Sequence, residues 1–135
     1  MAIQLSVSAR NGYLDAIETA AGASAILKVR TGAAPATCAT ADSGTVVATL
    51  NLPADWMAAA AAGAKAKSGT WEDLSADATG TAAHFRVYAS DGTTCHIQGT
   101  VTATGGGGDM ECSTVSFVAA VVVTVTTFTL TAGAA

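Results

Sequence analysis

The chain has 135 residues, of which 12% are charged and 50% are hydrophobic, and its net charge is −4. This length allows one domain with a substantial core but not two of ordinary size. The longest apolar run, residues 117–123, is far shorter than the roughly 18 residues that a membrane-spanning helix needs. The six basic residues are scattered, whereas nucleic-acid-binding proteins gather Lys and Arg on one face. The composition therefore predicts neither membrane insertion nor direct binding to nucleic acid.

Residues 1–14 lack the basic region, apolar stretch and cleavage site of a secretory signal, so we expect synthesis and assembly in the cytosol. The segment after Ser6 or Ser8 predicts a helix over about residues 6–21 that ends at Gly22. Its apolar positions recur at three- and four-residue spacing: Tyr13, Leu14, Ile17, Ala20 and Ala21.

Two strands are expected next, from Ala25 to Thr31 and from Thr45 to Leu52, because each has β-branched or alternating apolar residues. The small residues of Gly32–Gly44 predict a long loop between them. Pro53 stops the second strand, and Asp55–Ala66 is expected to be a loop or a single helical turn.

Two alternating runs between Ala83 and Ala103 flank Ser90-Asp91-Gly92 and predict a hairpin. A two-residue Asp-Gly loop would mix core and surface residues on each face. A three-residue loop with a bulge at Gly92 sorts them instead, and we prefer it. It pairs Phe85 with Ile97 and Val87 with Cys95 on one face. The other face then carries His84 with Gln98, Arg86 with His96, and Tyr88 with Thr94.

The C-terminal part predicts a flexible turn at Gly105, Gly106, Gly107 and Gly108, and a short strand within Met110–Thr114. No Gly-Lys-Ser or Gly-Lys-Thr follows the glycines, so they do not read as a phosphate-binding loop. A long strand from Ala119 to Thr131 changes the phase of its apolar residues near Thr126, which indicates a bulge. About seven short strands and no alternating helices predict a mainly β fold, an antiparallel β-sandwich or jelly roll with one short N-terminal helix.

The three cysteines, Cys38, Cys95 and Cys112, are an odd number without the CxxC spacing of a zinc site. We interpret them as small buried side chains with free thiols, although one pair could close in oxidising surroundings. A metal bound by His84 and His96 would need Cys95 or Cys112, and the preferred register turns Cys95 to the opposite face. The sequence therefore predicts no metal and no cofactor.

No residues suggest catalysis, because the chain has no nucleophile elbow or other local signature. Glu72 and Asp73 are adjacent on a probable strand, where neighbouring side chains point to opposite faces. Trp56 and Trp71 are best explained as core anchors. The polar stripe of the hairpin has residue types that suit a protein interface, and we treat it as a possible interaction face. An ordinary solvated sheet face explains it equally well. The stripe consists of His84, Arg86, Tyr88, Thr94, His96 and Gln98.

Several segments resemble small structural proteins of tailed bacteriophage virions, most of all the capsid cement (decoration) proteins. They are RNGYLDAIET, LPADWMAAAA, SGTW, HFRVYASDGTTCHIQGTVTATGGGGDM and TFTLTAG. The resemblance implies a single β-rich structural domain over residues 1–135, without catalytic residues or cofactor. It also implies binding to the major capsid protein and to copies of itself, as a dimer or trimer, at the capsid surface of a virion assembled in the host cytoplasm.

Low charge is compatible with such a role, because a subunit covered by neighbours needs few charges for solubility. The loops Gly32–Gly44 and Gly105–Gly108 are our candidates for the parts that reach adjacent subunits. Two other functions stay open. One is a phage tail, neck or head-tail connector component; the other is a carbohydrate- or receptor-binding β-sandwich module, if the rings of Trp56, Trp71 and Tyr88 are exposed.

Overall fold

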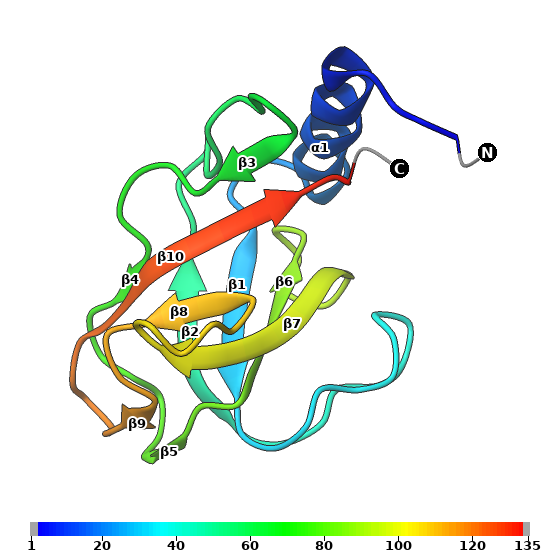
Figure 1. Cartoon of the computed structure of the whole chain (residues 1–135). Coiled ribbons are helices and arrows are strands. Elements are labelled where there is room, and N and C mark those ends of the chain that lie inside the picture. Colours follow the sequence, from blue (N-terminus) through cyan, green and yellow to red (C-terminus); the bar gives the residue numbers. More distant parts are fainter. Residues whose placement is uncertain (1–2, 134–135) are drawn as a thin grey trace.

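The computed structural model describes residues 3–133, and within them one N-terminal helix is followed by ten strands (Figure 1). Helix α1 spans Val7–Ala21 and agrees with the predicted bounds. Ser6 caps it, since its side chain accepts a hydrogen bond of 3.1 Å from the backbone N–H of Ala9. No helix in this part of the chain is long and apolar enough to cross a membrane.

The strands are β1 Ile26–Arg30, β2 Val46–Asn51, β3 Ala64–Ala66, β4 Glu72–Asp73, β5 Gly80–Thr81, β6 His84–Tyr88, β7 Cys95–Ala103, β8 Met110–Cys112, β9 Ser116–Phe117 and β10 Val123–Thr131. The large sheet has the order β2-β1-β6-β7-β8-β10-β3, with β4 also paired to β10, while β5 and β9 form a separate pair. The prediction of a mainly β fold with one N-terminal helix is confirmed. However, β7 and β8 run parallel, so the sheet is mixed, and it curls strongly into a half-barrel that is not clearly a sandwich or jelly roll (Figure 1).

The parallel pair depends on the glycine loop between β7 and β8. Parallel strands usually need a connection of a dozen or more residues, and this loop is far shorter. The backbone N–H groups of Gly105 and Gly107 donate to the carboxylate of Glu111, at 3.2 and 3.1 Å. A Cβ on Gly106 would lie 2.6 Å from the Cβ of Thr102, so the loop folds back this closely only with glycine there. The turn predicted to be flexible is thus tied down by several hydrogen bonds of its own.

The β6–β7 hairpin forms, but not in the predicted register. Val87 pairs with Ile97, and Phe85 pairs with Gly99, which is a shift of two residues. The connection is longer than the three-residue loop because Asp91 organises it, accepting hydrogen bonds from the backbone N–H groups of two following threonines. Since side chains alternate with a period of two, this shift keeps Phe85, Val87 and Ile97 on the core face, as predicted.

A bulge in the same hairpin overturns the predicted orientation of Cys95. The register changes between Val87 and Tyr88, so that Tyr88 pairs with Cys95. One extra residue in a strand turns the following side chains to the other face. Cys95 therefore lies on the Tyr88 face and not, as predicted, with Val87 on the core face.

The C-terminal strand contains the predicted bulge, because the β10–β8 register shifts between Val125 and Thr127. The strand begins at Val123, later than expected, and leaves Val121 in an exposed turn. Asp55–Ala66 contains no helix; it is a loop that ends in β3, Ala64–Ala66.

An aromatic cluster fills the hollow of the curled sheet. Trp56 and Trp71, predicted as core anchors, are at most 1% exposed, and their ring centroids lie 5.9 Å apart. The ring of Phe128 lies 5.1 Å from that of Trp71, tilted by 38°, and contacts Phe85 edge-on at 5.5 Å. Burial of such rings removes a large apolar area from water and is a major favourable contribution to a core.

Polar contacts hold helix α1 against the strand β3 of the same chain. The buried amine of Lys65 lies 2.8 Å from the carboxylates of Asp15 and Glu18 on the helix. Burial by itself lowers the pKa of Lys65, but its hydrogen bonds to the two carboxylates outweigh this, and the pKa is raised. The lysine therefore stays charged, and the helix is anchored within its own subunit.

Candidate interaction surface

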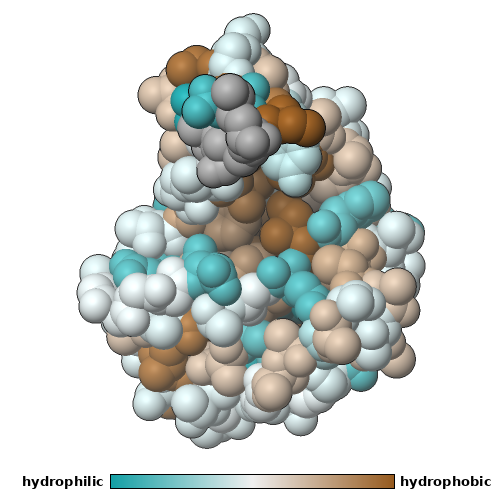
Figure 2. Space-filling view, turned by 45° about the vertical axis from the view of Figure 1, so that its right-hand side comes forward, coloured by the Kyte–Doolittle hydropathy of each residue, from teal (hydrophilic) through white to brown (hydrophobic). Residues whose placement is uncertain are grey.

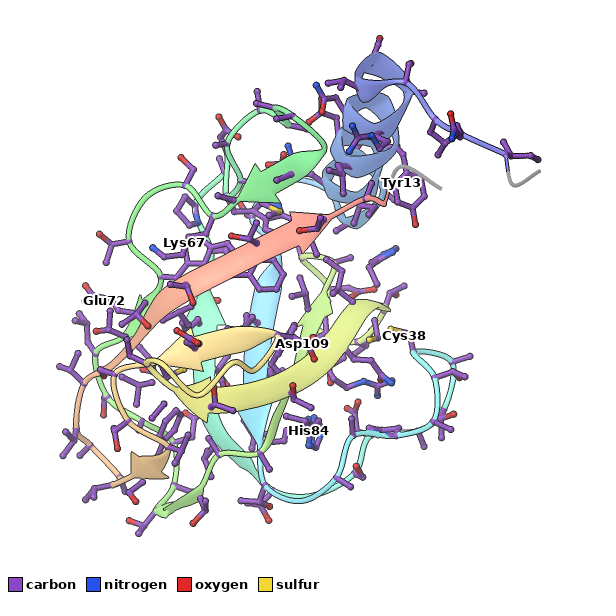
Figure 3. All side chains as sticks on the ribbon, viewed as in Figure 1. Tyr13, Cys38, Lys67, Glu72, His84 and Asp109 are labelled. Carbon is purple, nitrogen blue, oxygen red and sulfur yellow. The ribbon has the colours of Figure 1, made fainter. Side chains whose placement is uncertain are left out.

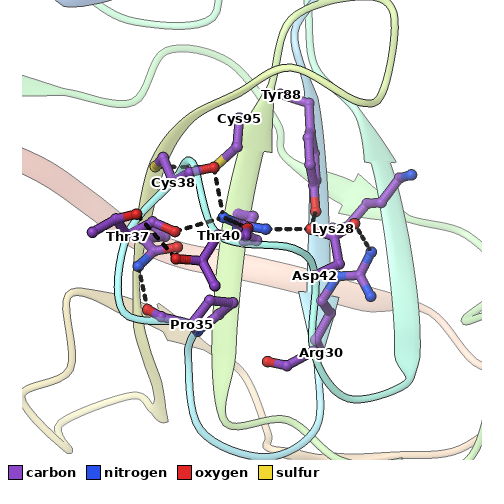
Figure 4. A network of polar contacts seen from close by, with 12 residues as sticks. Lys28, Arg30, Pro35, Thr37, Cys38, Thr40, Asp42, Tyr88 and Cys95 are labelled. Atoms are coloured by element: carbon purple, nitrogen blue, oxygen red, sulfur yellow. Dashed lines mark hydrogen bonds and ion pairs between the residues drawn. The ribbon is translucent and has the colours of Figure 1, made fainter.

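The polar stripe predicted as an interaction face is covered by the chain's own loop. Its three β6 residues, His84, Arg86 and Tyr88, are at most 1% exposed. They are covered because the loop of residues 31–45, between β1 and β2, folds across this side of β6 (Figure 4).

The rest of the stripe lies on or near β7. Gln98 is half-buried and donates a hydrogen bond of 2.6 Å to the carbonyl of Pro35 in the covering loop. Thr94 and His96 are exposed. The six residues therefore do not form one continuous exposed face, which corrects the reading of the stripe as an open surface.

Asp42 is the centre of the contacts beneath this loop (Figure 4). Its carboxylate accepts hydrogen bonds from Arg30 at 2.8 Å, from Tyr88 at 2.7 Å and from Arg86. Partial burial raises the pKa of Asp42, but the hydrogen bonds from Tyr88 and Arg86 and the two positive charges outweigh it, and the pKa is lowered. The carboxylate is thus charged at neutral pH and forms ion pairs with two guanidinium groups, of whose two positive charges it balances one.

The buried guanidinium of Arg86 also holds the loop backbone. Its Nη2 donates to the carbonyls of Thr37, Cys38 and Thr40, at 3.0, 2.9 and 3.1 Å. These bonds satisfy a charge that would be costly to bury alone. The loop Gly32–Gly44, predicted to reach a neighbouring subunit, is thus folded onto its own sheet. Gly105–Gly107 are exposed and Gly108 is half-buried, so the second predicted contact loop is accessible.

An exposed apolar arm lies at the helix end of the molecule. Ile3, Leu5 and Val7 are 85%, 45% and 48% exposed, and polar residues separate them. Tyr13, on helix α1 at the same end, is 62% exposed (Figure 3). Before the helix begins, the arm extends away from the sheet (Figure 1). Its alternation is visible in the sequence as Ile-Gln-Leu-Ser-Val, a signal that the sequence analysis missed.

A second group of exposed apolar side chains lies in the turn that leads into β10. Val118, Val121 and Val122 are each about half exposed, and Leu74 beside β4 is 69% exposed. Backbone hydrogen bonds between Ala76 and the turn residues 120 and 121 bring the two segments together. We call the segment with Val118, Val121 and Val122 the valine turn. It lies at the opposite end of the molecule from the arm, because the turn is next to β9 and the arm leads into α1 (Figure 1).

A groove of about 370 Å³ lies between β7 and β10, where the half-barrel is open. Its lining is half apolar and half polar: Phe85, Ile97, Phe128 and Leu130, with Gln98, Asp109, Thr129 and Thr131. Figure 2 shows the hollow with an apolar floor and hydrophilic residues at its rim. In the part of the chain that the structure describes, no strand pairs with Cys95–Gly99 of β7 on the groove side.

The aromatic rings that would carry a carbohydrate platform are not on the surface. Trp56 and Trp71 lie in the core, and Tyr88 lies beneath the covering loop. Glu72 and His84 are well separated (Figure 3). Among residues 3–133, no group of three or more His, Cys, Asp or Glu side chains is placed to bind a metal ion.

Comparisons with protein-family models, with curated proteins and with solved structures give no match to this chain.

Proposed function

We propose that this chain is a non-enzymatic virion structural protein that binds and stabilises the capsid shell of a tailed bacteriophage as a cement (decoration) subunit. The observation that carries the proposal is the pair of exposed apolar regions at opposite ends, the arm Ile3–Val7 and the valine turn. A free monomer gains nothing from such regions, whereas a subunit between neighbours buries both. Its partners would be the major capsid protein and copies of itself, at the capsid surface.

The half-barrel suits a load-bearing subunit. Its core is continuous, its covering loop is fastened by charged hydrogen bonds, and its helix is anchored by buried ion pairs. Such a body holds two distant contact regions at a fixed separation. The sandwich or jelly-roll topology implied by the resemblance remains a prediction.

The arm is the segment that we expect to bind a neighbouring subunit. Its residues 3–6 lie before the helix and carry Ile3 and Leu5, while Val7 is the first residue of α1. An extended segment with alternating apolar residues binds by adding a strand to an open sheet edge. The groove between β7 and β10 offers such an edge, with a floor that includes Phe85 and Phe128. We therefore propose the arm of a second copy as its occupant. The arm has no charged residue between Ile3 and Val7, which suits an apolar floor.

The two rival functions differ in what supports them. A tail, neck or connector component would use the same two apolar ends but would form closed rings of fixed number. The carbohydrate-binding alternative depended on exposed rings, and the burial of Trp56, Trp71 and Tyr88 removes that support.

The test compares the wild type with the double variant Ile3→Ser, Leu5→Ser. Light scattering gives the mass in solution, and co-sedimentation with empty shells of the source phage measures attachment. We expect a dimer or trimer that sediments with shells, and a variant that remains folded but loses both properties. Thr70→Ala, an exposed change in the loop between β3 and β4 and outside the arm, the groove and the valine turn, is the matched control and should behave as the wild type. A wild-type monomer that ignores the shells would contradict the proposal, and a ring of fixed number would favour the connector.

A further inference from the structure

Two cysteines that are distant in the sequence meet at the edge of the covering loop. The Sγ atoms of Cys38, in the loop, and Cys95, at the start of β7, lie 3.0 Å apart, although 57 residues separate them (Figure 4). Both side chains are half-buried, whereas Cys112 is fully buried. The prediction that all three are buried therefore holds only for Cys112.

The loop brings these sulfur atoms together without a covalent bond. Arg86 donates to the carbonyl of Cys38 itself, and Asp42, a few residues further on, binds the same guanidinium. Gln98, on the strand that carries Cys95, holds the loop at Pro35. The conformational entropy that the loop must lose to bring the two sulfur atoms together is therefore already lost when the protein folds.

We propose that Cys38 and Cys95 form an intramolecular disulfide that fastens the covering loop to β7 when the protein meets a small-molecule disulfide such as oxidised glutathione. In the first step the Cys38 thiolate attacks one glutathione sulfur; the glutathione S–S bond breaks, a mixed disulfide forms, and one glutathione leaves. In the second step Cys95 attacks the Cys38 sulfur and releases the other glutathione. Two protein thiols are oxidised, one glutathione disulfide is reduced, and both protons pass to the released thiols.

The order of the steps follows from the surroundings of Cys95. Burial, together with the hydrogen bond to Cys38, raises the pKa of Cys95 to about 12, so its thiolate is scarce at neutral pH. Burial also raises the pKa of Cys112 to about 12, and that thiol lies in the core. Cys95 also donates its S–H to the sulfur of Cys38 at 3.0 Å, so Cys38, the acceptor of that hydrogen bond, is the first attacker. The core thiol of Cys112 takes no part.

The experiment equilibrates the purified protein with oxidised glutathione, then unfolds it and alkylates the free thiols. We expect a single unfolded chain that has lost two hydrogen atoms and takes up one alkyl group, with peptide mapping that joins Cys38 to Cys95. Cys112→Ala should form the same bond, whereas Cys38→Ser and Cys95→Ser should not. Three alkylated thiols in the wild type, a bond to Cys112, or a bond between chains would overturn the proposal.

Thermal unfolding supplies a second measurement. Because the closed loop is long, the oxidised wild type should melt roughly 5–15 °C above the reduced protein. Cys38→Ser should show no difference between the two conditions. An oxidised wild type that melts no higher than the reduced protein would show that the bond does not fasten the loop.

Discussion

The polar side of β6 and the apolar arm Ile3–Val7 differ in how polarity relates to exposure. Arg86 and His84 are buried, while Ile3 is 85% exposed. The polar side is buried because a loop of the same chain supplies a carboxylate and backbone carbonyls to it. The arm is exposed because no strand in the described part of the chain pairs with it. Exposure is thus decided by what covers a segment, and polarity alone predicts it poorly.

The largest expected effect comes from removing the buried charge. Arg86→Ala leaves Asp42 with one guanidinium partner and leaves the loop carbonyls without a donor, so we expect a loss of about 3 kcal/mol in the free energy of unfolding. Urea denaturation measures it. His96→Ala, from the same predicted stripe but exposed, should change stability by less than about 0.5 kcal/mol. Equal effects for the two variants would contradict the contrast between covered and open residues.

A smaller effect is expected in the glycine loop. Gly106→Ala places a Cβ within 2.6 Å of Thr102 and should cost about 1–3 kcal/mol. Gly12→Ala in helix α1 is the control, since nothing lies within 4 Å of its added Cβ. Because alanine has the higher helix propensity, this variant should gain about 0.5–1 kcal/mol in the free energy of unfolding. Opposite signs in thermal melts of the two variants are the expected result. Destabilisation by both would mean that the close approach to Thr102 is not the cause.

Acid should weaken the covering loop before it affects the apolar ends. The pKa of Asp42 is lowered below its ordinary value of 3.8 in the folded protein. A carboxyl group whose pKa is lower in the folded than in the unfolded protein stabilises the fold at pH values above its unfolded-state pKa. This contribution is lost as the pH falls through its folded-state pKa. We expect the urea concentration at the unfolding midpoint to decrease at pH values below about 3.8. This decrease should be less steep in Asp42→Asn. An identical pH dependence in that variant would show that the carboxylate does not carry the effect.

The smallest effect on stability is expected at the valine turn. Val121→Ser with Val122→Ser changes side chains that are 53% and 49% exposed, so the free energy of unfolding should move by less than about 0.5 kcal/mol. Attachment to shells should nevertheless weaken, because the turn is one of the two proposed contact regions. Full attachment, measured by co-sedimentation, would remove the turn from the interface and leave the arm alone.

The sequence by itself determined the helix, the hairpin and the bulge of the last strand. Each depends on neighbours along the chain: Ser6 caps its own helix, alternation orders Phe85 and Val87, and a change of phase near Thr126 marks the bulge. Local patterns of this kind are readable because backbone geometry fixes their period.

Only the tertiary structure decided the parallel β7–β8 pair, the cover over β6 and the meeting of Cys38 with Cys95. The first depends on Gly106 fitting against Thr102, and the other two depend on a loop that returns to strands far along the sequence. Such contacts join residues without a common period, so no local pattern encodes them. The physical origin of the cover over β6 is the need of the buried Arg86 charge for partners, which a distant segment of suitable length can supply.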